Sequence, residues 1–127
     1  MVRRDDVLWS RTDAGPYVST GVLYEDLLYY TKSRDAILVA ANPKSGEKVI
    51  EETRLPGLSS MYASMVAAKD RIYITSREGT VLVIKHGPKL QVLATNEFDE
   101  GIDASPAIVG KQMFIRGQRH LYCVEKK

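Results

Sequence analysis

Arginine and tyrosine side chains stand at matching places in the chain, where they could bind a ligand together. Arg34, Arg77 and Arg119 each fall in or beside a predicted turn, and Tyr17 and Tyr62 each come just before a predicted strand. A guanidinium makes forked hydrogen bonds to carboxylates and phosphates, and a tyrosine ring offers a flat surface for stacking. The pattern favours an anionic or peptide ligand. The alternative is that the arginines are solvated turn residues and the tyrosines pack in the interior.

A second candidate is an acidic stretch, in which Asp99, Glu100 and Asp103 lie within five residues. Carboxylate oxygens bind Ca²⁺, but these acids lack the regular spacing of an EF-hand loop. We therefore expect a solvated acidic loop rather than a metal site. The residues that we expect on the ligand-binding face are Tyr17, Arg34, Tyr62, Arg77, Asp103 and Arg119.

The chain offers little material for catalysis. His86 and His120 are the only histidines, and neither has a cysteine or histidine partner at zinc-binding spacing. Cys123 lies in an apolar run, so we expect a small buried hydrophobic residue there rather than a nucleophile. The sequence has no phosphate-binding glycine loop and no G-x-S-x-G nucleophile elbow. We therefore predict no catalytic, cofactor-binding or metal site, and no enzyme activity.

The composition argues against several classes of protein. The 127 residues carry 18 lysines and arginines against 16 aspartates and glutamates, a net charge of +2. That charge is too small to indicate nucleic acid or an anionic membrane as the main partner. No apolar run approaches the roughly 20 residues of a transmembrane helix. No apolar core follows Arg3 and Arg4, so we expect no signal peptide and, for the chain as written, a cytoplasmic protein.

The elements that must position the candidate residues repeat three times. Each repeat opens with a segment that contains a serine, and the serines are 45 and then 41 residues apart: Ser19, Ser64 and Ser105. Each repeat continues into a strand centred on an aromatic residue, and the aromatics are 44 and then 41 residues apart: Tyr29, Tyr73 and Phe114. Because apolar residues flank these aromatics, we expect all three rings to be largely buried between the repeats.

More apolar runs complete each repeat, with turn-forming residues between them. The third runs are residues 37–40, 81–84 and 121–124, and the fourth runs are residues 47–51 and 90–94. Short runs rich in Val, Ile, Leu and Tyr predict strands. Four strands in about 40–45 residues is the spacing of one β-propeller blade. The predicted fold is therefore all-β: a β-propeller of four-stranded antiparallel blades, three blades per chain.

The predicted propeller segment covers residues 7–127, with blade material in residues 7–57, 58–101 and 102–127. The third block has three strands, and we expect residues 7–10 to supply its fourth. Three blades cannot close a ring, so we expect a homodimer with six blades. In it, residues 7–10 of each chain pair with residues 121–124 of the other, and Trp9 packs on the partner's third blade.

The repeats resemble those of the PQQ-like (pyrroloquinoline quinone) β-propellers over residues 7–127. Val7–Ser10 resembles the "VLW" sequence that ends a blade in that family, and Ser105–Ile108 resembles its opening strand. Asn42–Glu47 resembles its "DAKTGE" turn, and His120–Val124 resembles its last inner strands. The resemblance implies a propeller. It does not imply one activity, because the family includes quinone-dependent alcohol dehydrogenases and a non-enzymatic outer-membrane assembly lipoprotein.

The quinone site of those enzymes does not carry over to this sequence. The resemblance implies adjacent cysteines, a calcium site of Glu, Asn and Asp, and a tryptophan beneath the quinone. This chain has the single Cys123, and its only tryptophan, Trp9, lies in the presumed outer strand. Relatives are often periplasmic, which leaves the native compartment open.

The favoured function is a non-catalytic binding or scaffold module that takes a protein or other ligand on the loop face around the central channel. The alternatives are a fragment of a larger quinoprotein-like enzyme and a purely self-assembling structural ring. We expect no cofactor, no nucleic-acid partner and no membrane insertion.

Overall fold

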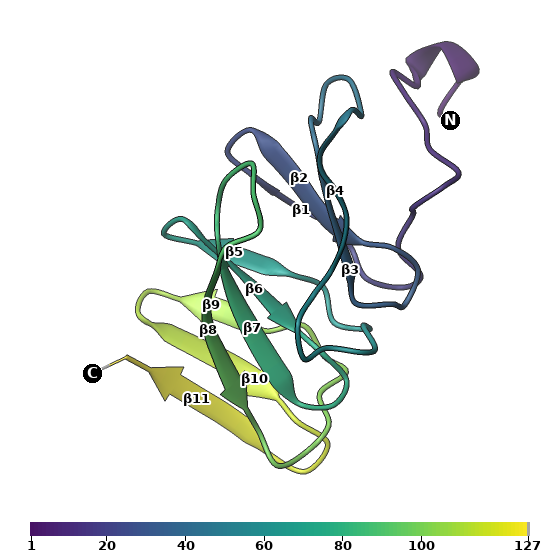
Figure 1. The fold of residues 1–127 in the computed structure, drawn as a ribbon. Coiled ribbons are helices and arrows are strands. Elements are labelled where there is room, and N and C mark those ends of the chain that lie inside the picture. Colours follow the sequence, from purple (N-terminus) through teal and green to yellow (C-terminus); the bar gives the residue numbers. More distant parts are fainter. Residues whose placement is uncertain (127) are drawn as a thin grey trace.

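The computed structural model describes residues 1–126, which fold into three antiparallel sheets and one short 3₁₀ turn at Arg4–Asp6 (Figure 1). Two sheets have four strands and the third has three. Blade 1 contains β1 (Val22–Tyr24), β2 (Leu27–Thr31), β3 (Ile37–Ala41) and β4 (Lys48–Arg54). Blade 2 contains β5 (Val66–Ala68), β6 (Arg71–Thr75), β7 (Thr80–Lys85) and β8 (Val92–Glu97). Blade 3 contains β9 (Ala107–Val109), β10 (Gln112–Arg116) and β11 (Leu121–Glu125).

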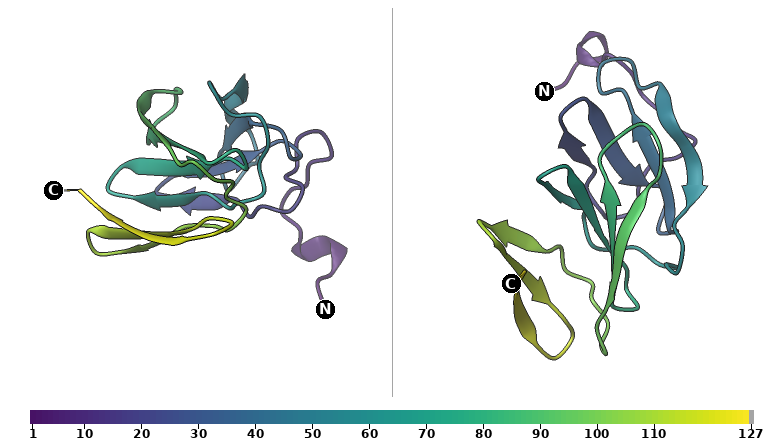
Figure 2. Two further views of the ribbon diagram at one scale, coloured as in Figure 1. Left: turned by 90° about the horizontal axis from the view of Figure 1, so that it is seen from below. Right: turned by 60° about the vertical axis from the view of Figure 1, so that its left-hand side comes forward.

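The three sheets stack face to face in chain order (Figure 2). Within each blade the strands follow one another as an antiparallel meander, and along one side of the stack β5 contacts both β1 and β9. This is the arrangement of consecutive propeller blades, whose innermost strands line the channel. The predicted all-β propeller fold is therefore confirmed. The outer strands β4 and β8 begin one and two residues later than predicted and run on to Arg54 and Glu97.

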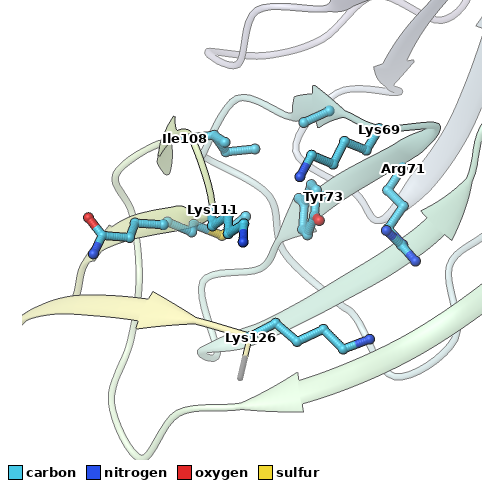
Figure 3. Close-up of a pocket in the computed structure, with 10 residues that line it drawn as sticks. Lys69, Arg71, Tyr73, Ile108, Lys111 and Lys126 are labelled. Carbon is cyan, nitrogen blue, oxygen red and sulfur yellow. The ribbon is translucent and has the colours of Figure 1, made fainter.

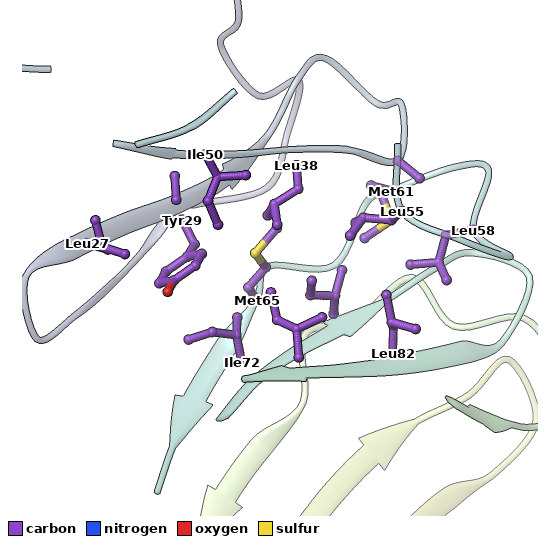
Figure 4. Packing of buried hydrophobic residues seen from close by; sticks show 14 residues of the cluster. Leu27, Tyr29, Leu38, Ile50, Leu55, Leu58, Met61, Met65, Ile72 and Leu82 are labelled. Atoms are coloured by element: carbon purple, nitrogen blue, oxygen red, sulfur yellow. The ribbon is translucent and has the colours of Figure 1, made fainter. Parts of the chain in front are cut away.

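The largest apolar core lies between blades 1 and 2 (Figure 4). Alternate residues of one strand point to opposite faces of a sheet, so Tyr29 and Leu38 of blade 1 meet Ile72 and Leu82 of blade 2. The segment between β4 and β5 adds side chains to the same core: Leu55, Leu58, Met61 and Met65. A smaller core of Val81, Ile102 and Ile115, with Tyr73 and Tyr122 packed against it, joins blades 2 and 3.

The three central aromatics are not equally buried. Tyr29 is fully buried, as predicted, but Tyr73 and Phe114 are half-buried. Each points toward the following blade: Tyr29 packs on blade 2, and Tyr73 packs on the three-stranded blade 3. Phe114 occupies the same position on the far side of blade 3, where residues 1–126 supply no fourth blade. The predicted burial of Cys123 is wrong for the same reason, because it pairs with Phe114 on that bare face and is exposed.

The N-terminal segment lies against blade 1 of its own chain. Val7–Ser10 forms no strand within the chain, and its pairing with residues 121–124 of a second copy stays a prediction. The Trp9 side chain contacts the β3–β4 turn of blade 1. Its indole Nε1 donates a hydrogen bond of 2.9 Å to the Pro43 carbonyl in the β3–β4 turn. The ring covers Gly46, where an added Cβ would approach it to 2.7 Å and where φ is +74°. A tight turn under an aromatic ring therefore needs glycine at this position.

A ladder of hydroxyl groups links the three blades near the channel. The Ser64 hydroxyl accepts a hydrogen bond of 2.8 Å from the Thr20 amide, and the Ser105 hydroxyl accepts one of the same length from the Ser64 amide. Each of the three residues stands two positions before its innermost strand begins. Thr20 is therefore the equivalent of Ser64 and Ser105, and the sequence alignment that placed Ser19 there was wrong by one residue.

Replacing Ser64 with alanine is expected to lower the free energy of unfolding by about 0.5–1.5 kcal/mol, because the Thr20 amide loses its acceptor between two blades. Urea denaturation measures the loss. The matched control is Ser19→Ala, since the Ser19 hydroxyl makes no hydrogen bond within residues 1–126. That change should stay within about 0.5 kcal/mol. Equal losses at the two positions would count against the ladder.

Candidate ligand-binding face

One end of the stack carries all the turns that we expected to bear ligand-binding residues. The β2–β3, β6–β7 and β10–β11 turns lie at the same end as the segments that lead into β1, β5 and β9, because strands alternate in direction within each blade. Backbone hydrogen bonds join these segments across blades: Met61 donates to the Arg34 carbonyl at 2.8 Å and Ile102 to the Arg77 carbonyl at 3.2 Å. The backbone that presents the arginines is therefore held in place.

Five of the expected residues form a continuous cluster on this end. The Tyr17 and Tyr62 rings lie 6.2 Å apart between centroids, and the Arg77 guanidinium lies 3.9 Å above the Tyr62 ring. The Nε of Arg77 also donates to Asp103 at 2.7 Å, which raises the pKa of Arg77 and keeps it charged. Arg34 extends the cluster, with its guanidinium carbon 5.8 Å from the Tyr17 centroid. Stacking of this kind is worth about 0.5–1 kcal/mol at exposed sites.

The cluster is open to solvent. Tyr17 is 61% exposed, and the side chains of Arg77 and Asp103 are 40% and 46% exposed. Arg34 makes no ion pair within residues 1–126. A guanidinium that stacks by its face on an aromatic ring keeps its N–H edge available for a carboxylate. We call Tyr17, Arg34, Tyr62, Arg77 and Asp103 the Tyr–Arg cluster.

Arg119, the sixth expected residue, belongs to a different group of side chains. Its backbone amide donates to the Glu100 carboxylate, and its guanidinium donates to the Asp99 carbonyl at 3.2 Å. The structure therefore places Arg119 at the same end of the stack but gives it no contact with the Tyr–Arg cluster.

The acidic stretch is the solvated loop that we predicted at Asp99 and Asp103, which are exposed, but not at Glu100. The Glu100 side chain is only 2% exposed and sits between blades 2 and 3. Its carboxylate accepts hydrogen bonds from the Tyr122 hydroxyl, the Arg119 amide and, at 2.7 Å, His120 Nδ1. These donors, with Tyr122 foremost, lower the pKa of Glu100 to about 2. The acids also fail to gather, since Asp103 pairs with Arg77 instead.

Sequence reasoning missed this carboxylate network. Two glycines are the only signal that could have revealed it. A Cβ at Gly117 would lie 2.5 Å from the Glu100 carboxyl carbon, and a Cβ at Gly101 would lie 2.7 Å from the Gln118 side chain. A glycine can indicate that a polar group packs closely against the backbone. The sequence does not show which polar group this is, because Glu100 and Gly117 come together only in the folded chain.

A second histidine network joins blades 1 and 2 at the end of the stack opposite the Tyr–Arg cluster. The Tyr29 hydroxyl lies 2.8 Å from His86 Nδ1, and Asp26 lies 3.2 Å from His86 Nε2. The order of these groups resembles a proton relay. However, the hydroxyl also accepts from the Gly87 amide at 3.0 Å, and burial raises the pKa of Tyr29. A protonated, enclosed phenol of this kind ties the blades together.

Known structures share this arrangement of blades. BamB from Moraxella catarrhalis aligns with a TM-score of 0.63 and 16% identity, over 85% of this chain and 33% of that chain. A europium-containing methanol dehydrogenase aligns with a TM-score of 0.66 and 11% identity, over 90% of this chain and 23% of that chain. This chain has a PQQ-like β-propeller fold.

The likeness is one of fold. The chain spans about a third of the length of BamB and about a quarter of that of the methanol dehydrogenase. No protein-family model matches the chain, and no curated protein matches it in sequence. A methanol dehydrogenase is an enzyme by name, so a PQQ-like propeller fold leaves the question of catalysis to the residues of the site.

The described residues do not fit the quinone site that the sequence resemblance implies. Trp9 packs at the β3–β4 turn of blade 1, at the opposite end of that blade from the Tyr–Arg cluster. Cys123 has no second cysteine beside it. Among residues 1–126, no three His, Cys, Asp or Glu side chains come together at metal-binding distances. A tryptophan floor, paired thiols and a calcium ligand set are thus not assembled by this part of the chain.

A basic groove lies between blades 2 and 3, at the end opposite the Tyr–Arg cluster (Figure 3). It has a volume of about 310 Å³, and Lys69, Arg71, Lys111 and Lys126 line it around Tyr73. None of the four cations makes an ion pair within the described residues. Over the same residues, no helix is both long enough and apolar enough to span a membrane.

Proposed function

We propose that this propeller segment is a non-catalytic binding module that takes a carboxylate-bearing protein segment on its loop face. The observation that carries the proposal is the Tyr–Arg cluster, in which two tyrosine rings and two arginines lie together, with Tyr17 and both arginines exposed and Tyr62 half-buried. Tyrosine and arginine are the residues that most often dominate binding energy at protein interfaces. Their presence together on one rigid loop face supports binding over catalysis.

The chemistry of the cluster favours a peptide with acidic and apolar side chains. The Tyr17 and Tyr62 rings, tilted by 40° to one another, form an apolar surface beside the unpaired Arg34. Arg34 can make a forked hydrogen bond to a carboxylate. Asp103 already engages one edge of Arg77, which fixes the guanidinium before a ligand arrives. Preorganised side chains lose less conformational entropy on binding.

The place of the cluster supports the same proposal. Tyr17, Tyr62 and Asp103 lie on the segments that lead into the innermost strands β1, β5 and β9. The cluster therefore stands near the mouth of the channel, where segments from successive blades converge. Loops on a rigid scaffold are a frequent location for binding sites.

One alternative is that the chain is part of a larger quinoprotein-like enzyme, which is favoured by the likeness to a methanol dehydrogenase. A bound quinone would add an absorption band at longer wavelength than those of Trp and Tyr. The other alternative is a ring that only assembles with itself. A ligand screen that yields no binder would favour that alternative.

Selection of peptides from a random library displayed on phage tests the proposed function. We expect the selected peptides to be enriched in acidic residues, and the best of them, made synthetically, to bind the wild-type protein by calorimetry. Arg34→Ala and Tyr62→Ala should each weaken that binding about tenfold or more, as loss of a hot-spot residue does.

The matched control is Arg71→Ala. Arg71 is an exposed arginine in the basic groove at the other end of the blades, so the substitution removes the same charge from the chain. Affinity should then stay within about twofold of wild type. Selected peptides that bind Arg34→Ala and wild type equally, or that lose affinity only with Arg71→Ala, would contradict the proposed site.

A further inference from the structure

The two junctions between blades differ at the end of the stack opposite the Tyr–Arg cluster. Tyr29 and Tyr73 occupy the same strand position, and each packs toward the following blade. At the first junction the Tyr29 hydroxyl lies 2.8 Å from His86 Nδ1 and accepts a hydrogen bond of 3.0 Å from the Gly87 amide. At the second junction the Tyr73 hydroxyl makes no hydrogen bond within residues 1–126. Polar contacts therefore close the first junction at this end and leave the second open.

The residue that closes the first junction is replaced by a lysine at the second. His86 of blade 2 and Lys126 of blade 3 each stand three positions after the residue that pairs with the central aromatic of their blade. The His86 ring packs on Tyr29, with centroids 5.8 Å apart. Lys126 instead lines the basic groove, in which the cations lie around Tyr73 (Figure 3). The groove thus occupies the place that a histidine fills one blade earlier.

A second departure from the repeat adds charge to the groove. The residue two positions before the central aromatic is Leu27 in blade 1 and Arg71 in blade 2. Leu27 is 5% exposed in the core shared with the next blade, whereas Arg71 lines the groove. Lys85 lies directly opposite Arg71 in the register of β6 and β7, so the two cations share a face. Like charges directly opposite one another destabilise a sheet, so the packing of blade 2 does not account for this pair.

Two more lysines stand at the tips of hairpins that flank the groove. Lys69 lies between the paired residues Ala68 and Arg71, so its loop has two residues, and the loop that carries Lys111 is equally short. Lys69 has a φ of +50°, a conformation for which such loops favour asparagine or glycine. The turn itself therefore does not call for a lysine, and its tight geometry holds the cation at the edge of the groove.

No carboxylate neutralises the groove. Asp70, beside Lys69, binds the Tyr24 hydroxyl of blade 1, which lies 3.0 Å from its amide and 3.4 Å from its carboxylate. Glu125 accepts a hydrogen bond of 3.3 Å from Gln112. Neither acid lines the groove, whose wall contains four cations. Positive charges that are held together without a counter-charge favour an anionic ligand.

The size and lining of the groove narrow the class of anion. Its volume of about 310 Å³ lies at the lower end of the range for small-molecule sites. Ile108 and Met113 add apolar surface beside Tyr73 and between the cations. A lysine ammonium binds phosphate as a point charge, without the forked geometry that suits arginine to a carboxylate. A phosphate ester carries a charge of about −1.5 to −2 near neutral pH, so its oxygens can engage several of these cations at once.

We propose that this groove binds a small molecule that carries phosphate groups next to a ring, of the class of the nucleoside diphosphates. The phosphates contact Lys69, Arg71 and Lys111, and the ring lies against the apolar side chains between them. The Tyr73 hydroxyl supplies one more donor. This site goes beyond the proposed function, because it lies at the other end of the stack and takes a different class of ligand.

Calorimetry with adenosine diphosphate (ADP), pyrophosphate and adenosine tests this proposal, in buffer free of divalent cations. We expect ADP to bind wild-type protein more tightly than pyrophosphate, because only ADP has a ring to contact Ile108 and Met113. Adenosine carries no phosphate and should not bind. Arg71→Gln and Lys69→Gln should each weaken ADP binding about tenfold, as loss of a charge-assisted hydrogen bond does.

Two controls separate the groove from general effects of charge and folding. Lys44→Gln removes the same charge from an exposed position of the β3–β4 turn, at the same end of the stack but on blade 1. Its affinity for ADP should stay within about twofold of wild type. Arg71→Gln should also raise the urea midpoint of the free protein, because it removes the repulsion with Lys85. Weaker ADP binding by this variant then does not come from unfolding.

Wild-type protein that binds neither ADP nor pyrophosphate would overturn the proposal. Equal weakening by Lys44→Gln and Arg71→Gln would do so as well, because binding would then follow total charge and not the groove. Equal affinities for ADP and adenosine would overturn the role of the phosphates, and equal affinities for ADP and pyrophosphate would overturn the contact with the ring. Arg34→Ala should bind ADP as wild type does, so this site and the proposed peptide site can fail separately.

Discussion

Replacing Tyr29 with alanine is expected to lower the free energy of unfolding by about 3–5 kcal/mol, the loss typical of removing a buried aromatic ring. Tyr29 is fully buried in the core between blades 1 and 2. The substitution also removes the hydroxyl that accepts from the Gly87 amide at 3.0 Å and contacts His86 at 2.8 Å. Both the cavity and the unpaired polar groups weaken the same junction.

Urea denaturation at one protein concentration measures this loss. A second variant separates the contribution of the hydroxyl from that of the ring, and a third serves as a control. Tyr29→Phe keeps the ring and removes only the hydroxyl, so it should cost about 1–3 kcal/mol. Tyr17→Ala is the matched control, because Tyr17 is 61% exposed and should cost less than about 1 kcal/mol. If Tyr29→Ala were no more harmful than Tyr17→Ala, the face-to-face packing of blades 1 and 2 would be wrong.

Acidification is expected to destabilise the protein through Glu100. The network around its carboxylate holds the pKa at about 2 in the folded protein, against 4.5 for an ordinary glutamate. The folded state therefore binds fewer protons than the unfolded state between these values. The stabilisation from Glu100 is complete above about pH 5 and is lost progressively as the pH falls toward 2. Protonation would also replace the Glu100 carboxylate by a neutral carboxylic acid, which is a weaker acceptor for its three hydrogen-bond donors.

The pH dependence of the urea midpoint tests this expectation. Glu100→Gln has no charge to lose, so it should be less stable than wild type at pH 7 and should lose less between pH 5 and pH 2. Some acid dependence should remain, because Asp13 and Glu52 also have lowered pKa values from their bonds to lysines. Glu51→Gln, at an exposed position of β4, should follow the wild-type profile. Parallel profiles for Glu100→Gln and wild type would contradict the assignment.

Much of the fold could be predicted from the sequence, because the signals for blades are local. Apolar runs centred on Tyr29, Tyr73 and Phe114, separated by turn residues, predict strands wherever they occur. Their recurrence predicts that one supersecondary unit is stacked several times. The structure confirms that all three runs are second strands of antiparallel sheets. Val7–Ser10 forms no strand within the chain, because an apolar run cannot form a ladder without a neighbouring strand and the strand predicted to pair with it belongs to a second copy.

The candidate site was predicted in part. Tyr17, Tyr62, Arg77 and Asp103 come together because equivalent turns of stacked blades lie at one end. That follows from the repeat and the antiparallel order alone. The exclusion of Arg119 from the cluster could not be predicted in this way. The buried carboxylate of Glu100 holds the β10–β11 turn that carries Arg119, and the other two blades have no acid at the equivalent position.

The sequence by itself determined the class of fold, the number of blades in the chain and the end of the blades at which the Tyr–Arg cluster lies. Only the tertiary structure decided how deeply each repeated residue is buried. Leu38 and Leu121 are the same amino acid at the same strand position, yet one is covered and the other bare. Glu100 likewise looks like any acid of a charged loop until blades 2 and 3 close around it. Burial depends on what packs against the far side of a sheet, and that neighbour comes from a distant part of the chain.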